Sequence, residues 1–125
     1  TNVDSVINPL TKSPKQVIRE INNISDTVPD GSVVIPVGTR FLIVEDIGSE
    51  SNTEPSLAWG NVVAHANDII EYDGLNWLVS FDSTLPTSPQ FVTNLRTGVQ
   101  YRYADGIWMK AYEGWYDEGD YSIVI

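Results

Sequence analysis

The sequence predicts a mainly β fold: a small barrel or sandwich built from successive β-hairpins, with one short N-terminal α-helix. Three observations predict it: short apolar runs bounded by turn residues, Asp-Gly turns that precede Trp-bearing strands, and a single helical pattern near the start. A chain of 125 residues is the size of one ordinary domain. We expect residues 1–12 to form an extended arm or linker without a hydrophobic pattern, and residues 13–125 to form a single β-rich domain.

The predicted helix follows Ser13. This serine is placed to cap the helix, Pro14 suits the first helical position, and Gln16 stands where a capping box requires a side-chain acceptor. One apolar stripe continues from there, made by Val17, Ile18, Ile21 and Ile24. A helix of this length is marginal alone, so the stripe is expected to pack on the rest of the domain.

Eight short strands are expected in the rest of the chain. Residues 40–45 form the clearest buried strand, because Phe-Leu-Ile-Val is continuous there. The remaining strands are expected at residues 32–35, 68–72, 77–81, 90–93, 99–103, 107–112 and 121–125. Residues 48–55 and 84–89 are expected to be loops because they are polar and rich in Ser, Thr and Pro.

Two of the predicted hairpins share a local pattern. Tyr72 lies five residues before Trp77, Tyr103 lies five residues before Trp108, and an Asp-Gly pair stands between the two rings in each case. Glycine supplies the positive φ that a tight turn needs, and the two rings can pack across the hairpin. We interpret the repeat as two successive hairpins of one domain.

Charge and composition narrow the function classes. The net charge of −10 repels phosphate backbones and anionic lipid, so we expect neither nucleic acid nor membrane as a partner. Solubility explains the charge most simply, with a basic partner surface or calcium as alternatives. The absence of cysteine removes disulfides, thiolate nucleophiles and Cys-based metal sites.

No enzyme motif is evident, and we predict no catalytic residue, cofactor or metal ion. The single histidine, His65, lies in an apolar stretch without a GxSxG motif and is interpreted as structural. The glycines build no phosphate-binding loop. Oxygen ligands for Ca²⁺ occur at 117–120 without EF-hand spacing. A glycosidase pair is disfavoured because the candidate carboxylates are spread over turns: Glu45, Asp46, Asp68, Glu71, Glu113, Asp117, Glu118 and Asp120.

The aromatic residues give the candidate interface. We interpret Trp77 and Trp108 as core residues, whereas for Trp115 and Tyr116 burial and exposure are about equally expected. Acidic groups around aromatic anchors suit a basic, partly apolar partner, although a solvated turn explains the same residues. The predicted interface consists of Trp115, Tyr116, Asp117, Glu118 and Tyr121.

Several stretches resemble a known class of proteins. Residues 68–82 (DIIEYDGLNWLVSFD), together with the segments Val92–Asn94, Thr97–Arg102 and Tyr112–Tyr116, resemble structural proteins of tailed bacteriophages of the T4-like myovirus type. The resemblance implies a non-enzymatic virion component of the head, neck or tail, synthesised in the host cytoplasm. Its implied partners are other virion proteins, in a homo-oligomer or another symmetric assembly.

The alternative function is a carbohydrate-binding module that uses exposed Trp and Tyr side chains. The hairpin at residues 68–82 also resembles the aspartate-plus-tyrosine hairpins of such modules. Exposure of the tryptophans distinguishes the two functions. A planar row of exposed rings would favour carbohydrate, whereas rings that are buried, or covered by a neighbouring subunit, would favour assembly.

Overall fold

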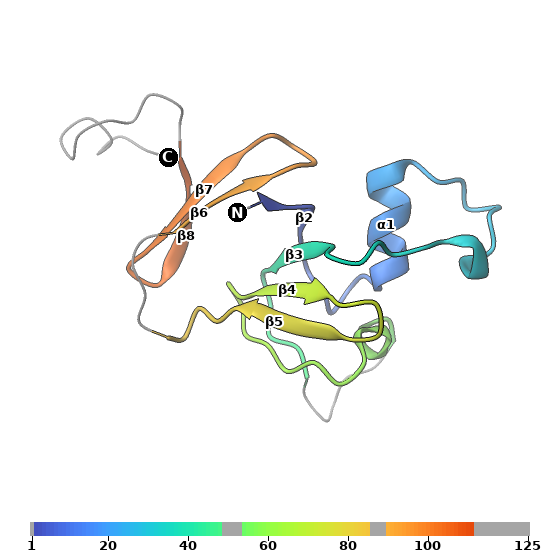
Figure 1. The fold of residues 1–125 in the computed structure, drawn as a ribbon, viewed down its shortest axis with the longest axis horizontal. Helices are drawn as coiled ribbons and strands as arrows, with labels where there is room; N and C mark the ends of the chain where they lie inside the picture. The colour runs from blue at the N-terminus through green and yellow to red at the C-terminus, as the bar shows by residue number, and fades with distance from the viewer. Residues whose placement is uncertain (1, 49–53, 86–89, 112–125) are drawn as a thin grey trace.

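The computed structural model describes residues 2–48, 54–85 and 90–111, and it confirms a mainly β fold with one α-helix. Figure 1 shows the helix on one side of the central strands and a separate group of three strands on the other side. The elements are β1 (Asn2–Val3), β2 (Ser5–Ile7), α1 (Pro14–Asn22), the 3₁₀ turn η1 (Asp30–Ser32), β3 (Arg40–Ile43), the 3₁₀ turn η2 (Ser56–Trp59), β4 (Ile69–Tyr72), β5 (Trp77–Phe81), β6 (Gln90–Asn94), β7 (Gln100–Ala104) and β8 (Ile107–Ala111).

The described strands form two four-stranded sheets, ordered β1-β6-β7-β8 and β2-β3-β4-β5. Neither sheet closes on itself, so the expectation of a barrel was wrong. Closure would require the first strands to pair with the last strand of their own sheet. Instead β1 pairs in parallel with β6 and β2 pairs in parallel with β3, so among the described residues β1 and β8 are the edges of one sheet and β2 and β5 are the edges of the other.

Residues 2–7 of the N-terminal segment are part of the two sheets and do not form a linker. Its two short strands each join a different sheet, and Val3 and Ile7 are buried in the core. The expectation that this segment lacks a hydrophobic pattern was therefore wrong. Val3, Ser5 and Ile7 alternate with period two and are all buried, a signal that is easily missed over so few residues.

Helix α1 begins as its sequence predicts. The Ser13 hydroxyl accepts from the Gln16 backbone N–H at 3.2 Å, and the Gln16 side chain accepts from the Ser13 N–H at 2.7 Å. Asn23 ends the helix in the left-handed conformation. Val17 and Ile18 are buried, and Ile21 and Ile24 pack against the same core, so the apolar stripe docks on the domain.

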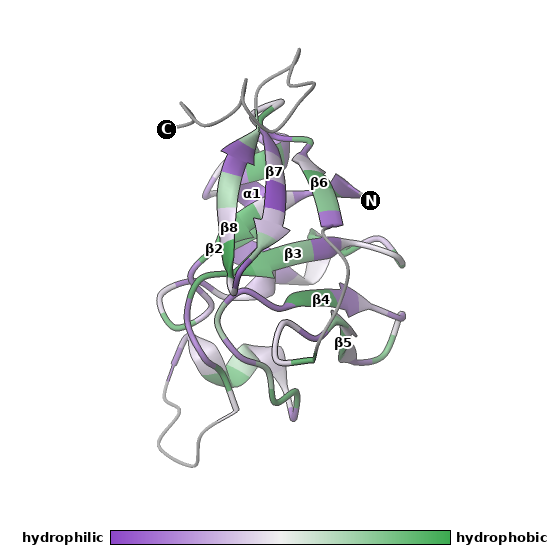
Figure 2. Ribbon diagram, turned by 90° about the vertical axis from the view of Figure 1, so that its left-hand side faces the viewer, coloured by the Kyte–Doolittle hydropathy of each residue, from purple (hydrophilic) through white to green (hydrophobic). Residues whose placement is uncertain are grey.

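The central strands are buried on both faces. Phe41, Ile43 and Ile70 belong to the core that contains α1, whereas Leu42 and Ile69 pack with Val3 and Val92 of the other sheet. This explains why residues 41–43 are continuously apolar rather than alternating. Figure 2 shows the hydrophobic residues concentrated on β3 and β4.

Three antiparallel hairpins follow the predicted boundaries closely. β4 pairs with β5, β6 with β7, and β7 with β8. The strand expected at 32–35 is absent, because Ser32 ends the 3₁₀ turn η1 and residues 33–36 have no strand assignment. The strand predicted at 121–125 lies outside the described residues.

Candidate functional site

Three aromatic rings from distant segments meet beneath the surface. Trp59 of η2 and Trp77 of β5 have ring centroids 4.9 Å apart, and Phe41 stacks on Trp77 at 5.3 Å. The indole N–H of Trp59 donates to the Lys12 carbonyl at 2.8 Å, which fixes η2 against the segment that leads into α1. Only 1% of Trp59 and 5% of Trp77 is exposed, so these rings form a floor rather than a surface.

A pocket of about 470 Å³, the aromatic pocket, opens above this floor. The N-terminal turn of α1, η1, η2 and the β4–β5 hairpin supply its walls, so four separate elements position it. Its volume lies within the usual range for binding cavities. The lining residues are Ser13, Pro14, Lys15, Gln16, Asp30, Ile35, Glu54, Pro55, Ala58, Trp59, Gly60, Tyr72, Leu75, Asn76 and Trp77.

Charged groups of both signs line this pocket, and of Lys15, Asp30 and Glu54 only Asp30 forms an ion pair with a residue that the structure describes. The Lys15 ammonium donates to the Asp30 carbonyl at 2.8 Å, and Arg19 binds the Asp30 carboxylate at 2.7 Å. Arg19 also donates to the carbonyls of Ser25 and Val28, so it holds the 25–30 loop on the helix. Within the part of the chain that the structure describes, Glu54 forms no ion pair.

Exposed aliphatic side chains lie on the segments that supply the pocket walls, and one of them, Leu75, lines the pocket itself. Leu75 is 86% exposed in the turn of the β4–β5 hairpin, and Val37 is 72% exposed beside it. The two segments are joined because the Gly38 N–H donates to the Tyr72 carbonyl at 2.8 Å. We call Val34, Val37, Leu57 and Leu75 the aliphatic rim; they lie on the 33–38 segment, η2 and the hairpin turn.

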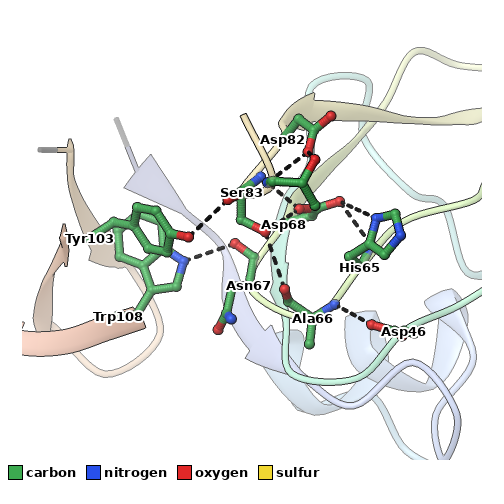
Figure 3. Close-up of polar contacts among 10 residues, drawn as sticks. Asp46, His65, Ala66, Asn67, Asp68, Asp82, Ser83, Tyr103 and Trp108 are labelled. Atoms are coloured by element: carbon green, nitrogen blue, oxygen red, sulfur yellow. Dashed lines mark hydrogen bonds and ion pairs between the residues drawn. The ribbon is translucent and has the colours of Figure 1, made fainter. Parts of the chain in front are cut away.

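A second polar site lies where the two sheets meet (Figure 3). The Asp68 carboxylate is buried and accepts from the His65 N–H at 2.9 Å, the Ser83 N–H at 2.8 Å and the Ser83 hydroxyl at 2.6 Å. Tyr103 donates to the Ser83 carbonyl and Trp108 to the Asn67 carbonyl, each at 2.9 Å. This site, the Asp68 clamp, therefore ties the β1-β6-β7-β8 sheet to the loop before β4 and to the residues that follow β5.

The Asp68 clamp brings a serine, a histidine and an aspartate together without the order of a catalytic triad. In a triad the serine donates to the histidine, which then acts as its base. Here the Ser83 hydroxyl donates directly to Asp68, while the His65 ring approaches the other carboxylate oxygen at 3.9 Å. The imidazole is thus on the far side of the carboxylate from the hydroxyl, and the arrangement supports a structural role for Asp68.

Two surface carboxylates have a lowered pKa. Hydrogen bonds from the backbone N–H groups of Asn76 and then Leu75 lower the pKa of Asp73, since they stabilise its charged form. The hydroxyl of Thr84, followed by its backbone N–H, lowers the pKa of Asp82. Each carboxylate accepts hydrogen bonds within its own turn and so stabilises that turn.

The structure accounts for several candidates raised from the sequence. Glu71 pairs with Arg40 at 2.6 Å and Asp46 accepts from the Ala66 N–H at 2.8 Å, so both carboxylates have structural partners. No group of three or more metal-ligating side chains occurs within residues 2–48, 54–85 and 90–111. No helix in these same ranges is long and apolar enough to cross a membrane. The predicted interface residues Trp115, Tyr116, Asp117, Glu118 and Tyr121 lie outside the described residues.

No local sequence pattern predicts the aromatic pocket. Its walls come from segments up to about sixty residues apart, and no local motif joins them. One signal was available: Leu75 is a large apolar residue inside an Asp-Gly-Leu-Asn turn, where polar residues are usual.

Comparisons with known proteins add no relative. A scan against family models found no match, and searches of curated proteins and of solved structures found none either.

Proposed function

We propose that this chain is a non-enzymatic structural and assembly domain of a bacteriophage virion, in its head, neck or tail, that acts through protein–protein contacts. The resemblance of residues 68–82 and the later segments to tailed-phage structural proteins suggests the virion. The observation that carries the binding role is the exposed Leu75 at the aromatic pocket, with the other exposed residues of the aliphatic rim on neighbouring segments, because exposed apolar groups beside a pocket mark interaction sites.

The disposition of the tryptophans favours assembly over carbohydrate binding. Trp59 and Trp77 are buried in the core, and Trp108 is half-buried with its N–H donated to Asn67. These three rings therefore do not offer the planar exposed row on which sugars stack.

We also infer a sandwich-like arrangement of the two sheets. Val3 and Val92 of one sheet share a core with Leu42 and Ile69 of the other, and partly buried side chains such as Phe81 and Trp108 pack around it. Hydrogen bonds of the Asp68 clamp add polar links at the same junction.

Mass spectrometry of purified phage particles tests the virion assignment. Particles produced by the virus whose genome encodes this chain should contain its peptides in amount comparable with other structural proteins. Absence of the peptides from intact particles, with presence in the infected-cell lysate, would contradict the proposal.

Light scattering during size-exclusion chromatography tests assembly of the chain with itself. We expect an oligomer of fixed stoichiometry whose population rises with concentration. A monomer at every concentration examined would contradict the expected homo-oligomer, while a role in a mixed assembly would still be judged by the particle experiment.

A further inference from the structure

We propose that the aromatic pocket and its aliphatic rim dock a basic, partly apolar segment of a different protein. This inference rests on the proposed function and specifies the partner: a segment with one bulky apolar side chain for the pocket and at least one Arg or Lys beside it.

Two exposed aliphatic side chains beside the pocket favour an apolar group in the partner. Leu75 and Val37 project from adjacent turns and are held there by the Gly38–Tyr72 hydrogen bond. An aliphatic side chain exposed to this extent gains little from the fold of its own chain. Burial against a partner would stabilise the complex by removing that surface from water. The pocket behind the rim can receive a side chain, and its buried aromatic floor provides the rigid packing typical of an interface hot spot.

Carboxylates outnumber ammonium groups in the pocket wall and the adjacent turn: Asp30, Glu54 and Asp73 stand against Lys15. Lys15 donates to the backbone carbonyl of Asp30, while Arg19, which lies outside the pocket lining, pairs with the Asp30 carboxylate. Glu54 in the pocket wall and Asp73 in the adjacent turn form no ion pair with any residue that the structure describes. The whole chain carries −10, so long-range attraction also favours a cationic partner.

Two other occupants are disfavoured. A second copy would bring the unpaired carboxylates of two chains together at this surface, so self-association would use another face of the chain. A saccharide stacks on exposed rings, and only 1% of Trp59 and 5% of Trp77 is exposed.

A displayed library of random 12-residue peptides, selected on the purified chain, provides the probe. We expect the enriched peptides to share a Leu, Ile or aromatic anchor with at least one Arg or Lys. Leu75→Ser should weaken the binding of synthesised peptides about tenfold or more, as expected when a central apolar contact is lost. Because Leu75 is exposed, the variant should keep the melting temperature of the wild type.

Two further variants separate the apolar and charged contributions. Leu95→Ser is the matched control, because Leu95 is also an exposed leucine in a hairpin turn, between β6 and β7, but belongs to the other sheet. It should leave peptide affinity unchanged. Glu54→Gln should weaken binding at low salt by a few-fold, and the difference from wild type should shrink at high salt.

The inference is overturned if no peptide is enriched, if the enriched peptides are acidic, or if they bind Leu75→Ser as tightly as wild type. It is also overturned if Leu75→Ser abolishes self-association, or if a panel of monosaccharides shifts the indole resonances of Trp59 and Trp77. Particle mass spectrometry is independent of the pocket. If virions contain peptides of this chain but the library selection enriches no peptide, the proposed function stands and this docking surface is rejected.

Discussion

The β4–β5 and β7–β8 hairpins carry the same local pattern and use it differently. In both, tyrosine and tryptophan lie directly opposite each other, with ring centroids 5.2 Å apart for Tyr72 and Trp77 and 5.0 Å apart for Tyr103 and Trp108. The cross-strand pair is thus a property of the hairpin. The residues that surround the pair come from other parts of the chain.

The difference lies in what each tryptophan meets beyond its own hairpin. Trp77 is enclosed by Phe41 and Trp59, which makes it part of the main core and of the pocket floor. Trp108 is half-buried against Phe81, and its N–H donates to the carbonyl of Asn67, in the loop that precedes β4 of the other sheet. One hairpin therefore supports the core, and the other joins the two sheets.

The turns differ as well. The second hairpin closes with the two residues Asp105 and Gly106, whose φ values of 56° and 82° suit a type I′ turn. The first needs four residues, from Asp73 to Asn76, and the Asp73 carboxylate accepts from two backbone N–H groups to hold them. The longer turn is what places Leu75 at the pocket.

Trp77→Ala should produce the largest loss of stability, about 3–5 kcal/mol, because it removes a buried indole that two other rings contact. Chemical denaturation of the purified variant measures it. Leu78→Ala, at the exposed neighbouring position, should stay within about 0.5 kcal/mol of wild type. A loss below about 1 kcal/mol for Trp77→Ala would mean that the two hairpins contribute alike to the core.

Asp68→Asn should lower the free energy of unfolding by about 2 kcal/mol. In the wild type both carboxylate oxygens accept from backbone N–H groups, and in the variant the amide NH₂ would face one of these donors. Equilibrium urea unfolding measures the change. Asp105→Asn is the control, since Asp105 has a positive φ in an exposed turn, where asparagine is equally suited. Equal stability of the two variants would show that the Asp68 clamp does not hold the sheets together.

Trp108→Phe should lower the free energy of unfolding by about 1 kcal/mol, because the Asn67 carbonyl loses its donor while most of the ring packing is kept. Tyr103→Phe should have a similar effect, because its hydroxyl donates to the Ser83 carbonyl. The double variant, compared with the two single variants, measures their coupling. Unchanged stability in both single variants would contradict the joining role of this hairpin.

Asp73→Asn should have the smallest effect, visible in the pH dependence of unfolding rather than at neutral pH. The pKa of Asp73 is lower in the folded protein than in the unfolded chain, so the unfolded state binds the proton first as pH falls. The stability that this carboxylate contributes is present above an unfolded pKa of about 3.9 and is lost as pH falls through the folded pKa. The variant should flatten the stability profile below about pH 4. A profile identical to that of wild type would show that the carboxylate does not hold the first turn.

The candidate site was harder to predict than the fold. The helix cap at Ser13, the strand at 77–81 and both Tyr/Trp hairpins follow from residues within a few positions of one another. The aromatic pocket joins α1, η2 and the β4–β5 hairpin, and the Asp68 clamp joins residues from 65 to 108. Neither has a local signature. The interface predicted around Trp115 stays a prediction.

By itself, the sequence determined the elements whose energetics are local: the capped helix, the turns that need Asp and Gly, and the cross-strand ring pairs. Only the tertiary structure decided that β1 and β2 belong to different sheets, because a parallel pairing depends on segments that the local pattern cannot identify. It also decided which tryptophan is enclosed and which links the sheets. Burial is set by what packs on a side chain from elsewhere in the chain, and that is why two equal hairpin patterns have unequal roles.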